Sequence, residues 1–224
     1  MKYLNLRLAG ILAIFLAMSI TTVQADSAYR QQGYEFSFQS QYVYGETIKY
    51  DGGAQAEVQS DAGFGFGLAY NYSNQFAFRG DFSWNSANYE ALRILDGGNP
   101  SETYGGLLET VSLMFGGDYY LLDKAITPYV GANLGWTFYD TNIPSGKPSS
   151  TCWYDPWYGY ICSTSTPTVS ETEFSYGLGL GVRAELGTNM FVRLGYYDRW
   201  TDFAKARDTT KFGAVRMDIG MKFY

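Results

Sequence analysis

Aromatic and polar residues alternate along residues 33–44, and this alternation constrains the fold more than any other feature of the chain. The aromatic residues stand at every second position but one, and they are Tyr34, Phe36, Phe38, Tyr42 and Tyr44. Polar residues, including Glu35 and Gln39, lie between them. Because successive side chains of a β-strand point to opposite faces, this segment is predicted to form a strand with one aromatic and one polar face.

Seven further segments repeat the alternation, at residues 62–72, 75–84, 110–121, 128–138, 174–186, 190–200 and 214–224. Each is close to the length of about nine to eleven residues that a tilted strand needs to cross a bilayer. A soluble β-sandwich or a lipocalin-like barrel also alternates, but it buries its large aromatic residues and exposes its charges. Here the faces opposite the apolar ones carry glycines and matched numbers of acids and bases, which favours apolar faces against lipid.

The connections between these segments alternate in length. Residues 73–74, 122–127 and 187–189 are short turns, whereas residues 45–61, 85–109, 139–173 and 201–213 are long loops. Short periplasmic turns and long extracellular loops are typical of outer-membrane barrels. The sequence therefore predicts an all-β fold, an eight-stranded antiparallel up-and-down transmembrane β-barrel. A ten-stranded barrel is the alternative if residues 139–173 contain another hairpin.

Ten charged residues fall on the faces that are predicted to point into the barrel. The acids are Glu35, Asp81, Asp118, Glu185 and Asp218, and the bases are Arg79, Arg183, Arg193, Arg216 and Lys222. Eight strands enclose a lumen just wide enough for side chains to fill, and an unpaired charge in it is costly. We therefore expect a paired network that plugs the barrel. The alternative is a gate for small solutes, for which the inward glycines of three strands leave room.

The amino terminus is typical of an exported protein. Lys2 and Arg7 precede an apolar run over residues 8–20, and Val23-Gln24-Ala25 is a small-x-small cleavage site. This pattern predicts a cleaved signal peptide at residues 1–25 and one barrel domain at residues 26–224. A retained N-terminal anchor is the alternative. Without Lys2 and Arg7, 14 basic residues stand against 22 acidic ones, and this net charge of −8 disfavours nucleic-acid binding.

Several segments resemble the OmpA-like superfamily of small outer-membrane β-barrels, which includes the opacity adhesins. The run at residues 127–136 (TPYVGANLGW) resembles the fifth strand of that group, and residues 174–186, with their GLGLGVR core, resemble the sixth. The resemblance extends through residues 190–200 and the closing aromatic strand, and it implies a barrel rather than an activity. Family members usually end on an outward phenylalanine, whereas here Tyr224 is last and Phe223 ends the apolar period. The resemblance implies that barrel-insertion machinery recognises this C-terminal strand.

The chain contains no histidine. Small outer-membrane enzymes of this shape use histidine as their base, so its absence favours a protein without catalytic residues. Two cysteines without histidine also form a poor metal site, so we expect neither a metal nor another cofactor.

Cys152 and Cys162 lie in the longest predicted loop. The compartment outside the inner membrane is oxidising, so a disulfide between them is expected. The segment between them contains five aromatic residues, namely Trp153, Tyr154, Trp157, Tyr158 and Tyr160. Rigid aromatic side chains favour binding surfaces, so we expect a partner-binding loop here. The alternative is that they pack on neighbouring loops or on lipopolysaccharide.

These patterns together predict an integral protein of the outer membrane, in contact with membrane lipid and lipopolysaccharide. We expect a monomer with a structural role that displays loops to a host or surface receptor, as an adhesin does. A small or gated channel of the porin type is the alternative function, and a receptor for phage or serum factors that uses the same loops is a third.

Overall fold

The computed structural model describes residues 30, 32–50, 55–94, 100–144, 147–203 and 206–223. The predicted signal peptide and Tyr224 lie outside the described residues.

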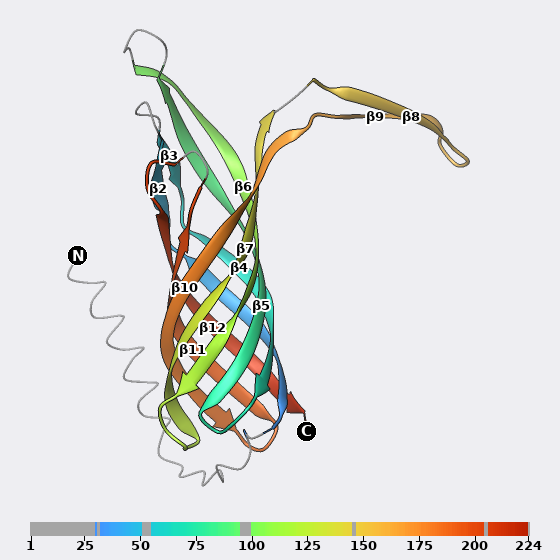
Figure 1. Cartoon of the computed structure of the whole chain (residues 1–224). Coiled ribbons are helices and arrows are strands. Elements are labelled where there is room, and N and C mark those ends of the chain that lie inside the picture. Colours follow the sequence, from blue (N-terminus) through green and yellow to red (C-terminus); the bar gives the residue numbers. More distant parts are fainter. Residues whose placement is uncertain are drawn as a thin grey trace, which may run out of the picture.

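Eight strands form a closed antiparallel barrel, as predicted (Figure 1). In their order around the barrel they are β1 (Tyr34–Val43), β4 (Asp61–Asn71), β5 (Phe76–Ile94), β6 (Pro100–Tyr120), β7 (Ile126–Pro144), β10 (Thr168–Leu186), β11 (Met190–Thr201) and β12 (Thr210–Phe223). The closing pair is β1 with β12, in a register that sets Tyr34 opposite Phe223 and Val43 opposite Ala214. Closure gives every barrel strand two neighbours, which satisfies backbone groups that lipid could not.

The three short turns lie together at one end of the barrel, where β12 also ends (Figure 1). By the rule for outer-membrane barrels this end is periplasmic. The opposite end is therefore extracellular. In the described part of the chain, no helix is long and apolar enough to cross a membrane.

Several predicted loops are wrong, because the strands continue far above the membrane. β5, β7 and β10 have 19 residues each and β6 has 21, about twice what a bilayer requires. Above the membrane no lipid contacts the outer face, so its apolar signal ends although the hydrogen-bond ladder goes on. The predicted loop at residues 45–61 likewise contains β2 (Glu46–Lys49) and β3 (Gln55–Val58), and β3 extends the sheet beside β5.

The predicted loop at residues 139–173 contains a hairpin of β8 (Ser149–Asp155) and β9 (Gly159–Ser165). These two strands form a separate two-stranded sheet, so the barrel keeps eight strands rather than ten. Figure 1 shows this hairpin extending sideways from the extracellular end. We call residues 149–165 the arm.

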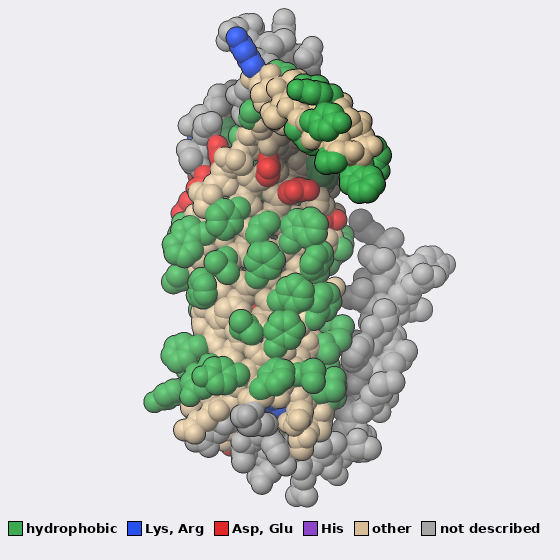
Figure 2. Space-filling view, turned by 90° about the vertical axis from the view of Figure 1, so that its right-hand side faces the viewer, with side chains coloured by type: hydrophobic (Ala, Val, Ile, Leu, Met, Phe, Trp, Pro, Cys, Tyr) green, Lys and Arg blue, Asp and Glu red, His purple; other side chains and the backbone are tan. Residues whose placement is uncertain are grey.

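An apolar belt surrounds the membrane-spanning part of the barrel. Figure 2 shows hydrophobic side chains covering this part of the face in view, with acidic side chains between them and the arm. Aromatic rings on neighbouring strands pair across the belt; the Phe64 and Trp84 centroids are 5.2 Å apart and those of Phe36 and Phe66 are 5.8 Å apart. The predicted inside-out distribution is thus the one observed.

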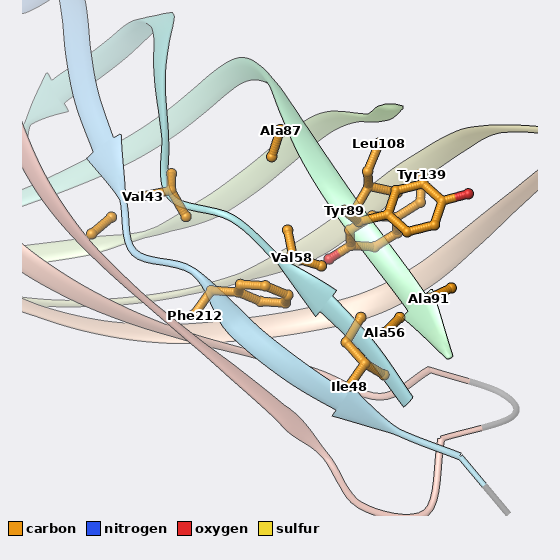
Figure 3. Packing of buried hydrophobic residues seen from close by; sticks show 11 residues of the cluster. Val43, Ile48, Ala56, Val58, Ala87, Tyr89, Ala91, Leu108, Tyr139 and Phe212 are labelled. Carbon is orange, nitrogen blue, oxygen red and sulfur yellow. The ribbon is translucent and has the colours of Figure 1, made fainter. Parts of the chain in front are cut away.

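Above the membrane the distribution reverses, and apolar side chains fill the interior (Figure 3). We call this cluster the upper core; its buried members are Val43, Ile48, Ala56, Val58, Ala87, Tyr89, Ala91, Leu108, Tyr139, Phe212 and Ala214. Tyr139 and Phe212 each pack against Phe203 from the loop after β11. The upper core places an apolar layer between the charged interior and the extracellular side.

Candidate functional site: the barrel interior and the arm

All ten charged residues predicted to face the lumen are buried, and each forms an ion pair. The strands place them there because an even spacing keeps each residue on the same face. They form two groups along the barrel axis. We call them the lower cluster, toward the periplasmic turns, and the middle cluster.

Arg183 is the centre of the lower cluster. Its guanidinium lies 2.7 Å from the Glu35 carboxylate and 2.8 Å from that of Glu185. Lys222 pairs with the second oxygen of Glu185 at 2.9 Å. Arg30, at the periplasmic end, approaches Glu185 to 3.6 Å. The two carboxylates are therefore held by three cations.

Aromatic rings complete the surroundings of Arg183. Its guanidinium carbon lies 4.0 Å from the ring centroid of Phe191 and 5.2 Å from that of Tyr120. The Tyr120 hydroxyl also accepts a hydrogen bond of 3.0 Å from Arg183. Cation–π contacts of this kind are strongest where water is excluded. The side chain of Arg183 is therefore fixed by contacts with both charges and rings.

The middle cluster joins three bases to three acids. Asp218 and Asp81 each accept ion pairs from Arg79 and Arg216, at 2.7–3.1 Å. In the same layer, the Arg193 guanidinium lies 2.7 Å from the Asp118 carboxylate.

Small residues on the inner faces make room for these long side chains. A Cβ at Gly67 would lie 2.5 Å from the Arg79 guanidinium, and one at Gly179 would lie 2.3 Å from the Tyr197 ring. Side chains from other strands thus fill the space that a gate would need, at least beside these two glycines. This geometry favours a plug over an open lumen.

Several interior residues were missed in the sequence analysis. Tyr120, Tyr129 and Phe191 are fully buried, although aromatic residues of a lipid-facing barrel were expected outside. Arg199 on β11 was missed as well, and it lines two small cavities below and within the upper core. The signal was available, because Phe191 and Arg199 share the odd-numbered face of β11 with Arg193.

The arm is closed by a disulfide between Cys152 and Cys162, which stand opposite each other in the β8–β9 register. At its tip the Asp155 carboxylate accepts hydrogen bonds from the backbone N–H groups of Trp157 and Tyr158, at 2.8 and 3.0 Å. Gly159 follows with a φ of 77°, a left-handed conformation that glycine adopts without strain. The tip is therefore a defined turn.

The five aromatic residues of the arm are exposed. Trp157 and Tyr158 at the tip have exposed fractions of 88% and 83%, and Tyr160, Tyr154 and Trp153 have 79%, 68% and 47%. Tyr154 and Tyr160 contact each other across the hairpin with ring centroids 6.0 Å apart. In the described structure these rings do not pack on neighbouring loops, which was the alternative drawn from the sequence.

In the described ranges, no three His, Cys, Asp or Glu side chains are grouped to hold a metal ion. The interior acids are engaged by arginine and lysine, which leaves them placed for structure rather than for proton transfer.

Comparison with known proteins identifies the architecture. The family described as "outer membrane protein beta-barrel domain" matches residues 13–223. No curated protein sequence matches the chain.

Among solved structures, Neisserial surface protein A (NspA) is similar with 14% identity and a TM-score of 0.52, over 85% of this chain and 97% of that one. Ail, the attachment invasion locus protein of Yersinia pestis, solved with the heparin analogue sucrose octasulfate, has 17% identity and a TM-score of 0.47. That match covers 86% of this chain and 100% of Ail. At these identities the likeness is one of fold alone.

Proposed function

The chain belongs to the outer membrane protein β-barrel domain family, and from this premise we propose that it is a non-enzymatic surface protein whose arm binds a partner outside the cell. The family match confirms the predicted outer-membrane location. The absence of histidine from the whole sequence supports the non-enzymatic part of the proposal.

The observation that carries the proposal is the exposure of the aromatic arm. Trp157 and Tyr158 bury almost nothing against the rest of the described chain, with exposed fractions of 88% and 83%. Large exposed apolar groups cost solubility and mark interaction sites. The disulfide and the Asp155 turn fix the rings in place, which lowers the entropy lost on binding.

The charge of the arm indicates which partners it favours. Residues 148–168 contain no lysine or arginine, and Asp155 is their one acid. Tight binding of sulfate groups needs such bases. A sulfated glycan like the analogue bound to Ail is therefore not the ligand that this arm favours. The surface suits a neutral partner whose apolar or ring-shaped groups stack on Tyr and Trp.

Adherence of bacteria displaying the protein to an epithelial monolayer tests the proposal. We expect the double variant Trp157→Ser/Tyr158→Ser to lose most of the adherence that the wild-type protein confers. The matched control is Thr151→Ser/Thr164→Ser in the stalk of the arm, which should adhere like wild type. Equal adherence of the aromatic variant and the control, at equal surface display, would contradict the proposal. Lipopolysaccharide as the partner would instead appear as binding of the arm to purified lipopolysaccharide vesicles.

A channel remains the second candidate, because the inner faces carry glycines and small cavities lie beside Arg199. We propose that the ion-paired interior keeps the barrel closed. Purified, refolded protein in a planar bilayer should then give no reproducible open steps. Steps whose conductance changes in Arg193→Gln would favour the channel instead.

We propose also that the barrel is a monomer, that its belt contacts membrane lipid and lipopolysaccharide, and that insertion machinery recognises β12. Phe223, at the end of β12, is half-exposed on the lipid side and supports the last point.

A further inference from the structure

Arg199 has no ion-pair partner among the described residues. It points inward from β11, next to the ten paired residues, which comprise five acids and five bases. Its hydrogen bond goes to the Ser112 hydroxyl, and among the described residues no carboxylate lies within ion-pair distance of it. The Arg199 guanidinium therefore has no ion-pair partner in the described part of the chain. An uncompensated charge in such surroundings is costly.

A cavity of about 40 Å³ lies beside this guanidinium, between the middle cluster and the upper core. Its polar lining includes Gln41, Ser83, Asn133, Tyr197, Arg199 and Arg216. A water molecule needs roughly 10–15 Å³ of such space, so the cavity accepts a group the size of two or three waters. Val43 and Phe212 of the upper core form part of its wall.

Gln41 provides a second, independent sign of a missing partner. Its side chain is 94% buried, since its exposed fraction is 6%, and its amide nitrogen has no hydrogen-bond partner in the described structure. A buried donor without an acceptor is rare in native proteins. The unpaired amide of Gln41 and the unpaired charge of Arg199 line the same cavity.

Two carboxylates, Asp81 and Asp198, also line the cavity. Asp81 accepts from Arg79 at 2.7 Å and from Arg216 at 3.1 Å. Asp198 pairs through Oδ2 with Lys211 at 2.9 Å, and its Oδ1 is buried without a hydrogen-bond partner in the described structure. Neither carboxylate forms an ion pair with Arg199.

We propose that this cavity binds one small monovalent anion, of the size of chloride, between the Arg199 guanidinium and the Gln41 amide. The site combines a guanidinium without an ion-pair partner, an unused neutral donor and a volume too small for a larger organic acid. The upper core above it limits exchange with the extracellular solvent. The proposal is independent of the role of the arm.

Thermal unfolding of the purified full-length protein in micelles tests the site, with chloride replaced by gluconate at constant ionic strength. A ligand that binds only the folded state raises its stability with concentration. We expect the Tm of the wild-type protein to rise by several degrees from gluconate to chloride, and that of Arg199→Gln to stay constant. In gluconate alone, Arg199→Gln should be at least as stable as wild type, because it removes the uncompensated cation.

Two controls keep the test decisive. Lys49→Gln removes an exposed cation of β2 that does not line the cavity, and it should keep the chloride response of wild type. Gln41→Leu should need about tenfold more chloride than wild type for the same rise in Tm. This variant tests the site even if Arg199→Gln fails to refold. In crystals soaked with bromide, the anomalous signal should lie between Arg199 and Gln41. An equal chloride response in wild type, Arg199→Gln and Gln41→Leu, or bromide bound at other places only, would overturn the proposal.

Discussion

Arg183 shows how a single side chain holds the barrel interior together. It is fully buried, bridges Glu35 and Glu185, and lies over the Phe191 ring. Removing one partner of a buried ion pair leaves the other charge desolvated, and this loss exceeds the net value of the pair. The interior is therefore sensitive to single substitutions that an exposed pair would tolerate.

We expect Arg183→Gln to lower the free energy of unfolding by about 3–5 kcal/mol, because two buried acids lose their main partner. Urea unfolding in micelles, followed by tryptophan fluorescence, measures the change. Lys211→Gln, which breaks an exposed pair with Asp198, should cost less than about 1 kcal/mol. A loss for Arg183→Gln as small as that of Lys211→Gln would contradict the role of the lower cluster.

Two glycines of opposite orientation provide a matched test of the packed interior. At Gly179 a Cβ would lie 2.3 Å from the Tyr197 ring, whereas at Gly80 the nearest atom would be the Phe115 ring at 3.5 Å. Gly179→Ala should therefore destabilise the barrel by about 1–3 kcal/mol, because it forces Tyr197 to move. Gly80→Ala should change stability by much less in the same urea unfolding measurement. An equal effect of the two substitutions would mean that the interior is loose at Tyr197.

At the scale of elements, the odd-numbered residues of β5 point inward along the strand, but they change from charged to apolar. Inside the membrane-spanning part its odd residues are Arg79 and Asp81, and above the membrane they are Ala87 and Tyr89; all four point inward and are buried. The outer face changes in the opposite sense at the same place, from the apolar Phe82 and Trp84 to the polar Ser86, Asn88 and Glu90. The strand therefore passes from lipid to water by exchanging which face is apolar.

The arm is an element whose stability is separate from that of the barrel, because in the described structure β8 and β9 pair only with each other. Cys152→Ser/Cys162→Ser removes a closure that contributes roughly 3 kcal/mol in the entropic description. We expect chymotrypsin to cut this variant within residues 153–160 much faster than the oxidised wild type. The Tm of the barrel should stay unchanged, and a drop of several degrees would mean that the arm supports the barrel.

At the scale of the whole molecule, the interior consists of layers. Charged clusters fill the membrane-spanning part, and the upper core closes the extracellular part. Because the upper core is built from strands that continue out of the membrane, we expect it to unfold as a unit apart from the barrel below.

Tyr139→Ala should open a cavity in the upper core and cost about 3–5 kcal/mol there. Hydrogen exchange should then rise in β2, in β3 and in the extracellular halves of β5 and β12. Exchange in β1 and β11 near the periplasmic turns should stay as in wild type. Faster exchange throughout all strands would show that the two layers unfold together.

The sequence alone determined the barrel, its strand order and the side chains that face lipid, because a period of two assigns each residue to one face of a strand. It also placed the ten interior charges, since Glu35, Arg183 and the others keep that phase. It did not determine their partners: Arg183 and Glu35 are 148 residues apart and meet only when the barrel closes. For the same reason the tertiary structure alone decided the packing of the upper core, the contact of Phe191 with Arg183 and the lack of an ion pair at Arg199 among the described residues. Each of these depends on which side chains meet across a closed lumen, and no single strand contains that information.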